Sequence, residues 1–377
     1  MAGAERSHGE DNAPPRRILI LKPSSLGDVL QAIPVLRLLR MRFPEAQIGW
    51  WIEASIAPLL QGDPDLDWVF PFHRKELLGW RGVRGLTSSV IEMRRRRFDW
   101  VLDLQSLARS AMVSWLVNGR LTVGLEDRRE GAPALHDFSV PRRSAATHAV
   151  DWYLDVLRFL RVPVDRSFEW LPIRPDIAGQ VARKWPVQKH RWLCLQPGAR
   201  WWNKRWPVEH FQSLIQQLGA EDPELGFVVL GSREDAALGA ALGAVFPERT
   251  FDLTGKTSLL ETIEWLRVSV ALVTNDTGPM HAAAALGAPV VGLFGPTDPN
   301  RTGPYGQLDR AVRLELPCAP CMEARCRNSE PLECLRGLSP RQVAARVRAH
   351  LHGGGGVASV FTDRGALDGR PQGRPST

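Results

Sequence analysis

The chain has 377 residues, of which 44% are hydrophobic and 24% are charged, a composition that is ordinary for a folded protein and excludes a disordered one. One hydrophobic core rarely holds so many residues, so we expect two domains. Lysine and arginine outnumber aspartate and glutamate by 48 to 41, and the net charge of +7 favours anionic partners such as a nucleotide, a nucleic acid or an anionic membrane surface.

The start of the chain, MAGAERSHGEDNAPPRR, is polar and lacks the apolar core of a secretory signal. The longest apolar stretch, from Pro279 to Phe294, is interrupted by Gly287, Pro289 and Gly292, so it predicts a helix, a turn and a strand rather than a membrane span. We therefore expect a cytoplasmic protein that at most rests on a membrane surface.

The first half of the chain alternates apolar strands with helices. Strands are expected at 17–22, 47–52, 67–72, 99–104 and 121–125, and helices at 29–43, 54–60, 83–97, 108–117 and 146–160. Continuously apolar strands separated by helices predict a parallel sheet covered on both faces.

A proline-rich passage from Pro163 to Pro186 is the expected crossing to a second domain of the same kind. Strands follow at 191–196, 226–231, 250–255, 270–275 and 288–294, and helices at 208–219, 233–245, 257–267, 277–286 and 338–351. The prediction is an α/β chain with a polar tail at 1–16, domains at 17–175 and 176–352, and a disordered Gly- and Pro-rich tail at 353–377. Two doubly wound domains place a ligand cleft between them, at the carboxyl ends of the strands.

The loop KPSSLGD (22–28) joins the first strand to the first helix and should face this cleft. Gly27 permits a tight turn, and Asp28 lies at the start of the helix. Asp28 is a candidate for chemistry, with a simple N-cap as the alternative. The loop lacks the GxGxxG pattern, so it does not support a nicotinamide site.

The loop QPGARWWNKRWP (196–207) also joins a strand to a helix. Lys204 and Arg205 precede Pro207, which lies near the helix start. A cation beside a helix N-terminus can neutralise a phosphate together with backbone N–H groups, and a solvated basic loop is the alternative. The tryptophans at 201, 202 and 206 either stack on a ligand or pack in the core.

The stretch LVTNDTGPMHAAA (272–284) crowds polar residues between a strand and a helix. Asp276 is placed to cap helix 277–286, while Thr277 and Gly278 present backbone N–H groups at its positive end. His281 lies near the same end, although a lone histidine is more often structural. GSRED (231–235) offers Ser232 and Glu234 as further cleft residues, and FGPTDP (294–299) could close over the same ligand.

Four of the five cysteines are clustered at Cys318, Cys321, Cys326 and Cys334. The CxxC opening has zinc-like spacing, but the later spacings match no standard zinc finger. Free or redox-active thiols and a structural zinc site are both open readings.

In this order, KPSSLGD, the Lys204–Pro207 loop, NDTGPMHAAAALGAP and LFGPTDP resemble glycosyltransferase family 9, the lipopolysaccharide heptosyltransferase family. The resemblance spans roughly residues 17–350. It implies a GT-B fold, in which two Rossmann-like domains bind the acceptor and the nucleotide-sugar respectively. It also implies inverting transfer of L-glycero-D-manno-heptose from ADP-heptose to the inner core (Kdo/heptose) on lipid A, without a cofactor.

By motif position, the resemblance assigns Asp28 as the general base and Lys204 as the contact to the donor phosphates. The other expected donor-site residues are Gly198, Arg205, Ser232, Glu234, Asp276, Thr277, Gly278 and His281. An inverting displacement needs a base for the acceptor hydroxyl and positive charge for the departing diphosphate, so no metal is required if these groups supply the charge.

The expected acceptor residues are Ser25, Gly27 and Arg109, the last from the segment LQSLARS (104–110). Arg109 could meet a Kdo carboxylate or a lipid phosphate, or it could merely solvate a helix. We expect a monomer that binds no nucleic acid and meets the anionic inner-membrane surface. The rival interpretations are a family 9 enzyme with another donor or acceptor, a GT-B nucleotide-sugar epimerase, and a non-catalytic binding module.

Overall fold

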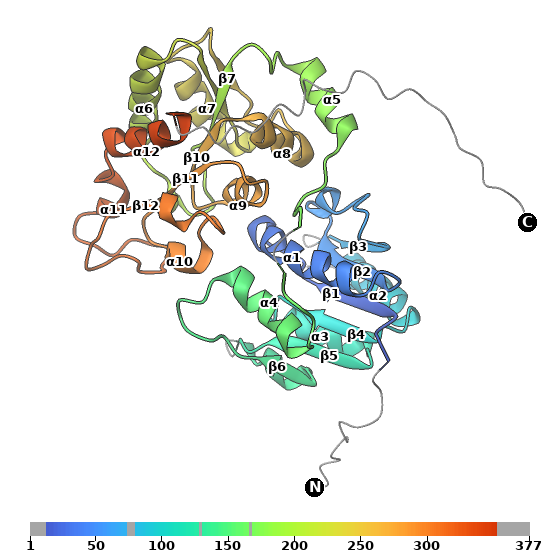
Figure 1. Ribbon diagram of the computed structural model, residues 1–377. Coiled ribbons are helices and arrows are strands. Elements are labelled where there is room, and N and C mark those ends of the chain that lie inside the picture. Colours follow the sequence, from blue (N-terminus) through green and yellow to red (C-terminus); the bar gives the residue numbers. More distant parts are fainter. Residues whose placement is uncertain (1–12, 74–79, 128–129, 166–167, 353–377) are drawn as a thin grey trace, which may run out of the picture.

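The structure is a computed structural model that describes residues 13–73, 80–127, 130–165 and 168–352. Within these residues the chain forms two α/β domains, each with a six-stranded parallel sheet (Figure 1). This arrangement confirms the predicted fold class. Residues 1–12 of the predicted N-terminal tail, and the whole predicted tail at 353–377, lie outside the described residues.

The N-terminal sheet has the strand order β3-β2-β1-β4-β5-β6. Its strands are β1 (Arg17–Leu21), β2 (Gln47–Glu53), β3 (Trp68–Phe72), β4 (Trp100–Asp103), β5 (Leu121–Leu125) and β6 (Phe138–Val140). Its helices are α1 (Leu26–Arg42), α2 (Trp80–Arg95), α3 (Ala108–Val117) and α4 (Ala149–Phe159). Because side chains alternate along a strand, Ile18 and Ile20 of β1 pack with α1 and α4, while Leu19 and Leu21 pack with α2 and α3.

The C-terminal sheet has the order β12-β11-β10-β7-β8-β9. Its strands are β7 (Arg191–Gln196), β8 (Leu225–Val229), β9 (Thr250–Asp252), β10 (Ala271–Asn275), β11 (Val290–Phe294) and β12 (Val312–Arg313). The helices are α5 (Pro175–Lys184), α6 (Val208–Glu221), α7 (Ala236–Gly243), α8 (Leu259–Val268), α9 (Gly278–Ala285), α10 (Pro299–Thr302), α11 (Glu333–Arg336) and α12 (Pro340–His352). Helices α6 and α12 cover one face of this sheet, and α8 and α9 cover the other.

Some predicted elements differ from the observed ones. The helix expected at 54–60 is only a 3-10 turn at Ala57–Leu59, and the expected inter-domain crossing contains α5, which packs on α8. The short edge strands β6 and β12 were not predicted. The domain boundary expected between 175 and 176 coincides with the first residues of α5 and stays a prediction.

The two domains meet through α1 and α9, which are in contact and lie next to one another in Figure 1. Two polar contacts add to this junction: Nε2 of His148 lies 3.1 Å from the carbonyl oxygen of Gly303, and the Tyr305 hydroxyl donates to Asp151 at 2.8 Å. Within the described residues, no helix has the length and apolar character needed to cross a bilayer.

Candidate active site

Asp28 lies in the first turn of α1, where the chain leaves β1. Ser25 is the N-cap residue, and its backbone N–H and its hydroxyl both donate to Oδ2 of Asp28, at 2.9 and 2.7 Å. This pairing of a serine with an acidic residue three positions later starts the helix at Leu26, ahead of the predicted Val29. Asp28 therefore helps to cap the helix and also lines the first pocket described below.

The buried ammonium of Lys22 lies close to Asp28. Its Nζ donates to the carbonyl of Leu104 at 2.9 Å and stands 4.8 Å from the centre of the Tyr153 ring. Burial by itself would raise the pKa of Asp28, but the charge of Lys22 and the hydrogen bonds from Ser25 outweigh it and hold that pKa below its ordinary value. Asp28 is therefore a carboxylate at neutral pH, the form that can accept a proton.

The corner between β10 and α9 brings a carboxylate, an ammonium and a hydroxyl together. Oδ2 of Asp276 accepts hydrogen bonds from Nζ of Lys204 and from Oγ1 of Thr297, both at 2.7 Å. The predicted role of Asp276 as the helix cap is wrong, because Thr277 is the N-cap residue and α9 begins at Gly278. The Asp276 carboxylate is satisfied instead by an ion pair that holds the ammonium beside the start of α9.

The loop between β7 and α6 carries this ammonium. Nζ of Lys204 lies 4.6 Å from the centre of the Trp201 ring, a cation–π distance. Asn275 anchors the loop, because its side chain accepts from the backbone N–H of Trp206 at 3.0 Å and donates to the carbonyl of Pro197 at 2.7 Å. Part of the polar crowding after β10 is therefore structural.

His281 lies where the two domains meet. Its Nδ1 is 3.3 Å from Nε2 of Gln31 on α1. A Cβ atom at Gly27 would come within 2.4 Å of the His281 ring, so the glycine is required for the close approach of the helices. Burial is the largest influence on the pKa of His281 and lowers it, so the imidazole is neutral at pH 7.

Two adjoining pockets have volumes of about 480 and 550 Å³, in the range of small-molecule sites. The first lies between the domains, and the second is lined by the C-terminal domain and by Leu26 of α1. The predicted residues that line the first are Ser25, Gly27, Asp28, Lys204, Asp276, Thr277, Gly278 and His281. The predicted residues that line the second are Gly198, Arg205, Ser232, Glu234 and, again, Thr277. Arg109 lines neither pocket and is exposed on α3.

Several lining residues were not singled out by the sequence. Arg200 lines the first pocket from a loop that was recognised, and Thr297 enters it from the FGPTDP segment that was expected to close over the ligand. Of the tryptophans that were expected either to stack on a ligand or to pack, Trp201 also lines this pocket. Trp206, by contrast, is core, at 2% exposure. Met322 lines the pocket from the cysteine-bearing loop, and no sequence signal indicated this.

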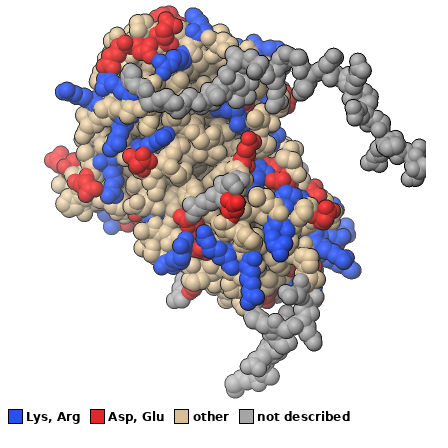
Figure 2. All heavy atoms as spheres, in the orientation of Figure 1, with Lys and Arg blue, Asp and Glu red and all other residues tan. Residues whose placement is uncertain are grey.

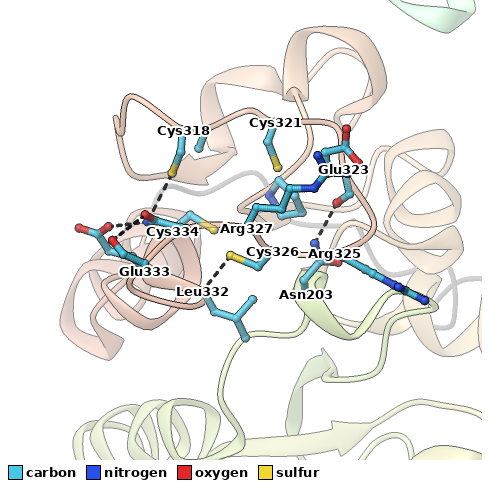
Figure 3. A pocket seen from close by; sticks show the side chains of 14 residues that line it. Asn203, Cys318, Cys321, Glu323, Arg325, Cys326, Arg327, Leu332, Glu333 and Cys334 are labelled. Atoms are coloured by element: carbon cyan, nitrogen blue, oxygen red, sulfur yellow. Dashed lines mark hydrogen bonds between the residues drawn. The ribbon is translucent and has the colours of Figure 1, made fainter.

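The four clustered cysteines line a separate cavity of about 320 Å³ (Figure 3). All four are free thiols, and within the described residues no group of three or more His, Cys, Asp or Glu side chains is arranged to hold a metal ion. The zinc reading stays a prediction. The cysteine-bearing loop also braces the candidate site. The side chain of Asn203, next to Lys204, donates to the backbone carbonyl of Glu323, and the backbone N–H of Met322 donates to the carbonyl of Pro296.

Comparison with known proteins gives a consistent result. Residues 88–331 match the sequence model described as glycosyltransferase family 9 (heptosyltransferase). The chain is 30% identical over 321 residues to lipopolysaccharide heptosyltransferase 2 of Salmonella typhimurium, which covers 79% of this chain and 88% of that protein. It is 28% identical over 367 residues to lipopolysaccharide heptosyltransferase 1 of Pseudomonas aeruginosa, with coverages of 89% and 98%.

Solved structures resemble both domains together. The ADP-heptose lipopolysaccharide heptosyltransferase II of Escherichia coli has a TM-score of 0.72 at 25% identity, covering 89% of this chain and 98% of that one. A family 9 glycosyl transferase from Veillonella parvula has a TM-score of 0.73 at 23% identity, with coverages of 89% and 97%. The architecture is the predicted GT-B fold.

Proposed function

Because the chain belongs to glycosyltransferase family 9, the heptosyltransferase family, we propose that it transfers heptose from ADP-L-glycero-D-manno-heptose to the inner core of lipopolysaccharide on lipid A. The enzyme is a glycosyltransferase, and the donor, the acceptor and the residue roles are the proposal. One observation carries it: Asp28 from the first domain and Lys204 from the second line the same pocket.

The first pocket is the proposed site of the donor diphosphate. The first N–H groups of a helix have no partner within the helix, so those of Thr277 and Gly278 are suited to phosphate oxygens. Lys204 adds an ammonium at the same place, held by Asp276. The second pocket then receives the nucleoside, where the carboxylate of Glu234 and the hydroxyl of Ser232 can bond the ribose hydroxyls.

The proposed reaction is a single displacement. Asp28 accepts the proton of the acceptor hydroxyl as its oxygen forms a bond to the anomeric carbon. The bond from that carbon to the diphosphate breaks on the opposite side, which inverts the configuration, and ADP departs with the electron pair. Lys204 and the start of α9 stabilise the charge that develops on the diphosphate, while Asp28 is held ionised by Lys22.

The acceptor is proposed to enter from the N-terminal domain, past Ser25 and Gly27. Arg109 stands apart from both pockets, so a contact with the acceptor requires a substrate that extends to α3. A lipid-linked acceptor would bring the enzyme to the cytoplasmic face of the inner membrane as a peripheral protein.

The test uses the purified chain with ADP-heptose and a defined Kdo-bearing lipid A precursor. ADP should appear only when the acceptor is present, and the acceptor should gain the mass of one heptose. Transfer from a different nucleotide-sugar would show another donor, and an epimerised donor without an acceptor would show an epimerase. Activity should persist in EDTA if Lys204 and α9 supply the positive charge.

A further inference from the structure

The outer face of the N-terminal domain carries exposed apolar side chains on two neighbouring helices. On α3, Met112 is 55% exposed and Trp115 is 60% exposed, and on α2 Ile91 is 49% exposed. The helices pack together over one face of the sheet, and Nη1 of Arg94 joins them by donating to the carbonyl of Leu116. Single exposed apolar residues are ordinary, but here three lie on two helices that pack together.

Cations surround these apolar side chains. Arg95 is exposed in the last turn of α2, and the basic run continues to an exposed Arg97. Glu92, the single carboxylate in this turn, pairs with Arg96 at 3.6 Å. The other arginines therefore leave the end of α2 with a net positive charge. Arg109 precedes Met112 by one helical turn on the exposed stripe of α3. Figure 2 shows Lys and Arg side chains gathered at the outer edge of the N-terminal domain, where Figure 1 places α2.

We propose that this α2–α3 patch (Ile91, Arg94, Arg95, Met112 and Trp115) docks the enzyme on an anionic phospholipid bilayer. Tryptophan and methionine on a helix surface enter the headgroup region, and neighbouring arginines attract anionic lipid phosphates. The inference rests on the proposed function, because an acceptor anchored by lipid A lies in such a bilayer. The patch belongs to the acceptor-binding domain, so docking holds that domain at the surface where the acceptor is found.

The test is sedimentation of the purified full-length chain with vesicles of phosphatidylcholine alone or with added phosphatidylglycerol. The chain should bind the anionic vesicles and not the neutral ones. We expect Met112→Ser with Trp115→Ala to weaken binding about tenfold or more, and Arg95→Gln about fivefold. The matched control is Ile173→Ser, which removes a side chain of similar exposure (45%) outside the patch, and it should bind as the unmodified chain does.

Transfer to a water-soluble acceptor fragment is measured on the same variants. Because none of the substituted residues lines either pocket, this activity should be unchanged. Equal vesicle binding by the patch variants and the unmodified chain would overturn the docking proposal, as would failure of the unmodified chain to bind anionic vesicles. Vesicle binding through the patch without any heptose transfer would instead overturn the proposed function and leave the docking surface standing.

Discussion

Replacing Lys204 by methionine removes the ammonium and keeps an unbranched side chain against Trp201. If Lys204 stabilises the departing diphosphate, kcat should fall about 10²–10³-fold, the loss of roughly 3–4 kcal/mol that follows removal of one preorganised contact to a developing negative charge. The change also leaves the Asp276 carboxylate, which is 8% exposed, with Thr297 as its remaining side-chain partner.

That carboxylate would then repel the diphosphate. Two unit charges about 5 Å apart at an effective dielectric constant of about 20 interact by roughly 3 kcal/mol. Adding Asp276→Asn to Lys204→Met should therefore recover about tenfold or more of the lost activity. In the unmodified enzyme, Asp276→Asn alone should lower activity, because it releases the ammonium that the carboxylate holds at 2.7 Å.

The assay is steady-state ADP release with saturating acceptor, with donor affinity measured separately by calorimetry. Lys256→Met is the matched control, since Lys256 is an exposed lysine of the same domain that pairs with Asp252 and lines neither pocket. A loss below tenfold for Lys204→Met, or a double variant less active than the single one, would refute the assigned role and favour a solvated basic loop.

Three further predictions concern single side chains. Asp28→Asn should lower kcat about 10²–10⁴-fold without changing donor affinity by calorimetry, and a fully active variant would exclude the assigned base. Lys22→Met should raise the pKa of Asp28 and move the acid limb of the pH profile of kcat/KM to higher pH, whereas a merely structural lysine would leave the limb in place. Burial lowers the pKa of His148 from 6.5 to about 4 in the folded protein. As the pH falls from 6.5 to about 4, the imidazole is therefore protonated in the unfolded chain before it is protonated in the folded one. The free energy of unfolding should drop by up to about 3 kcal/mol over this pH range. His148→Gln should flatten this slope in urea denaturation, and an unchanged slope would assign it to other groups.

The main features of the fold were predictable because buried parallel strands are continuous apolar runs. The segments that escaped prediction lack such a signal. Strands β6 and β12 lie at sheet edges and have only three and two residues. Segments this short cannot show the apolar run or the alternation of residues that marks a strand in sequence. Helix α5 lies in a proline-rich passage, yet Pro175 occupies its first turn, the one place where a helix accepts proline readily.

The candidate site was predictable where its residues follow strands, because the carboxyl ends of parallel strands converge on one edge. The partners of those residues were not predictable. Asp276 looks like a helix cap in sequence, and only the folded chain brings Lys204, 72 positions away, to its carboxylate. Lys22 ends an apolar strand without any pattern that distinguishes it from a solvated lysine, and Met322 reaches the pocket through long-range contacts of its loop.

The meeting of α1 with α9 ties the proposed chemistry to the relative position of the two halves of the molecule. A side chain at Gly27 would collide with His281, and one at Gly278 would come within 2.8 Å of Leu26. The contact between α1 and α9 therefore fixes how Asp28 of one domain lies relative to Lys204 of the other. Under the proposed mechanism, neither domain alone would hold both the proton acceptor and the ammonium, so transfer would require the two domains in contact.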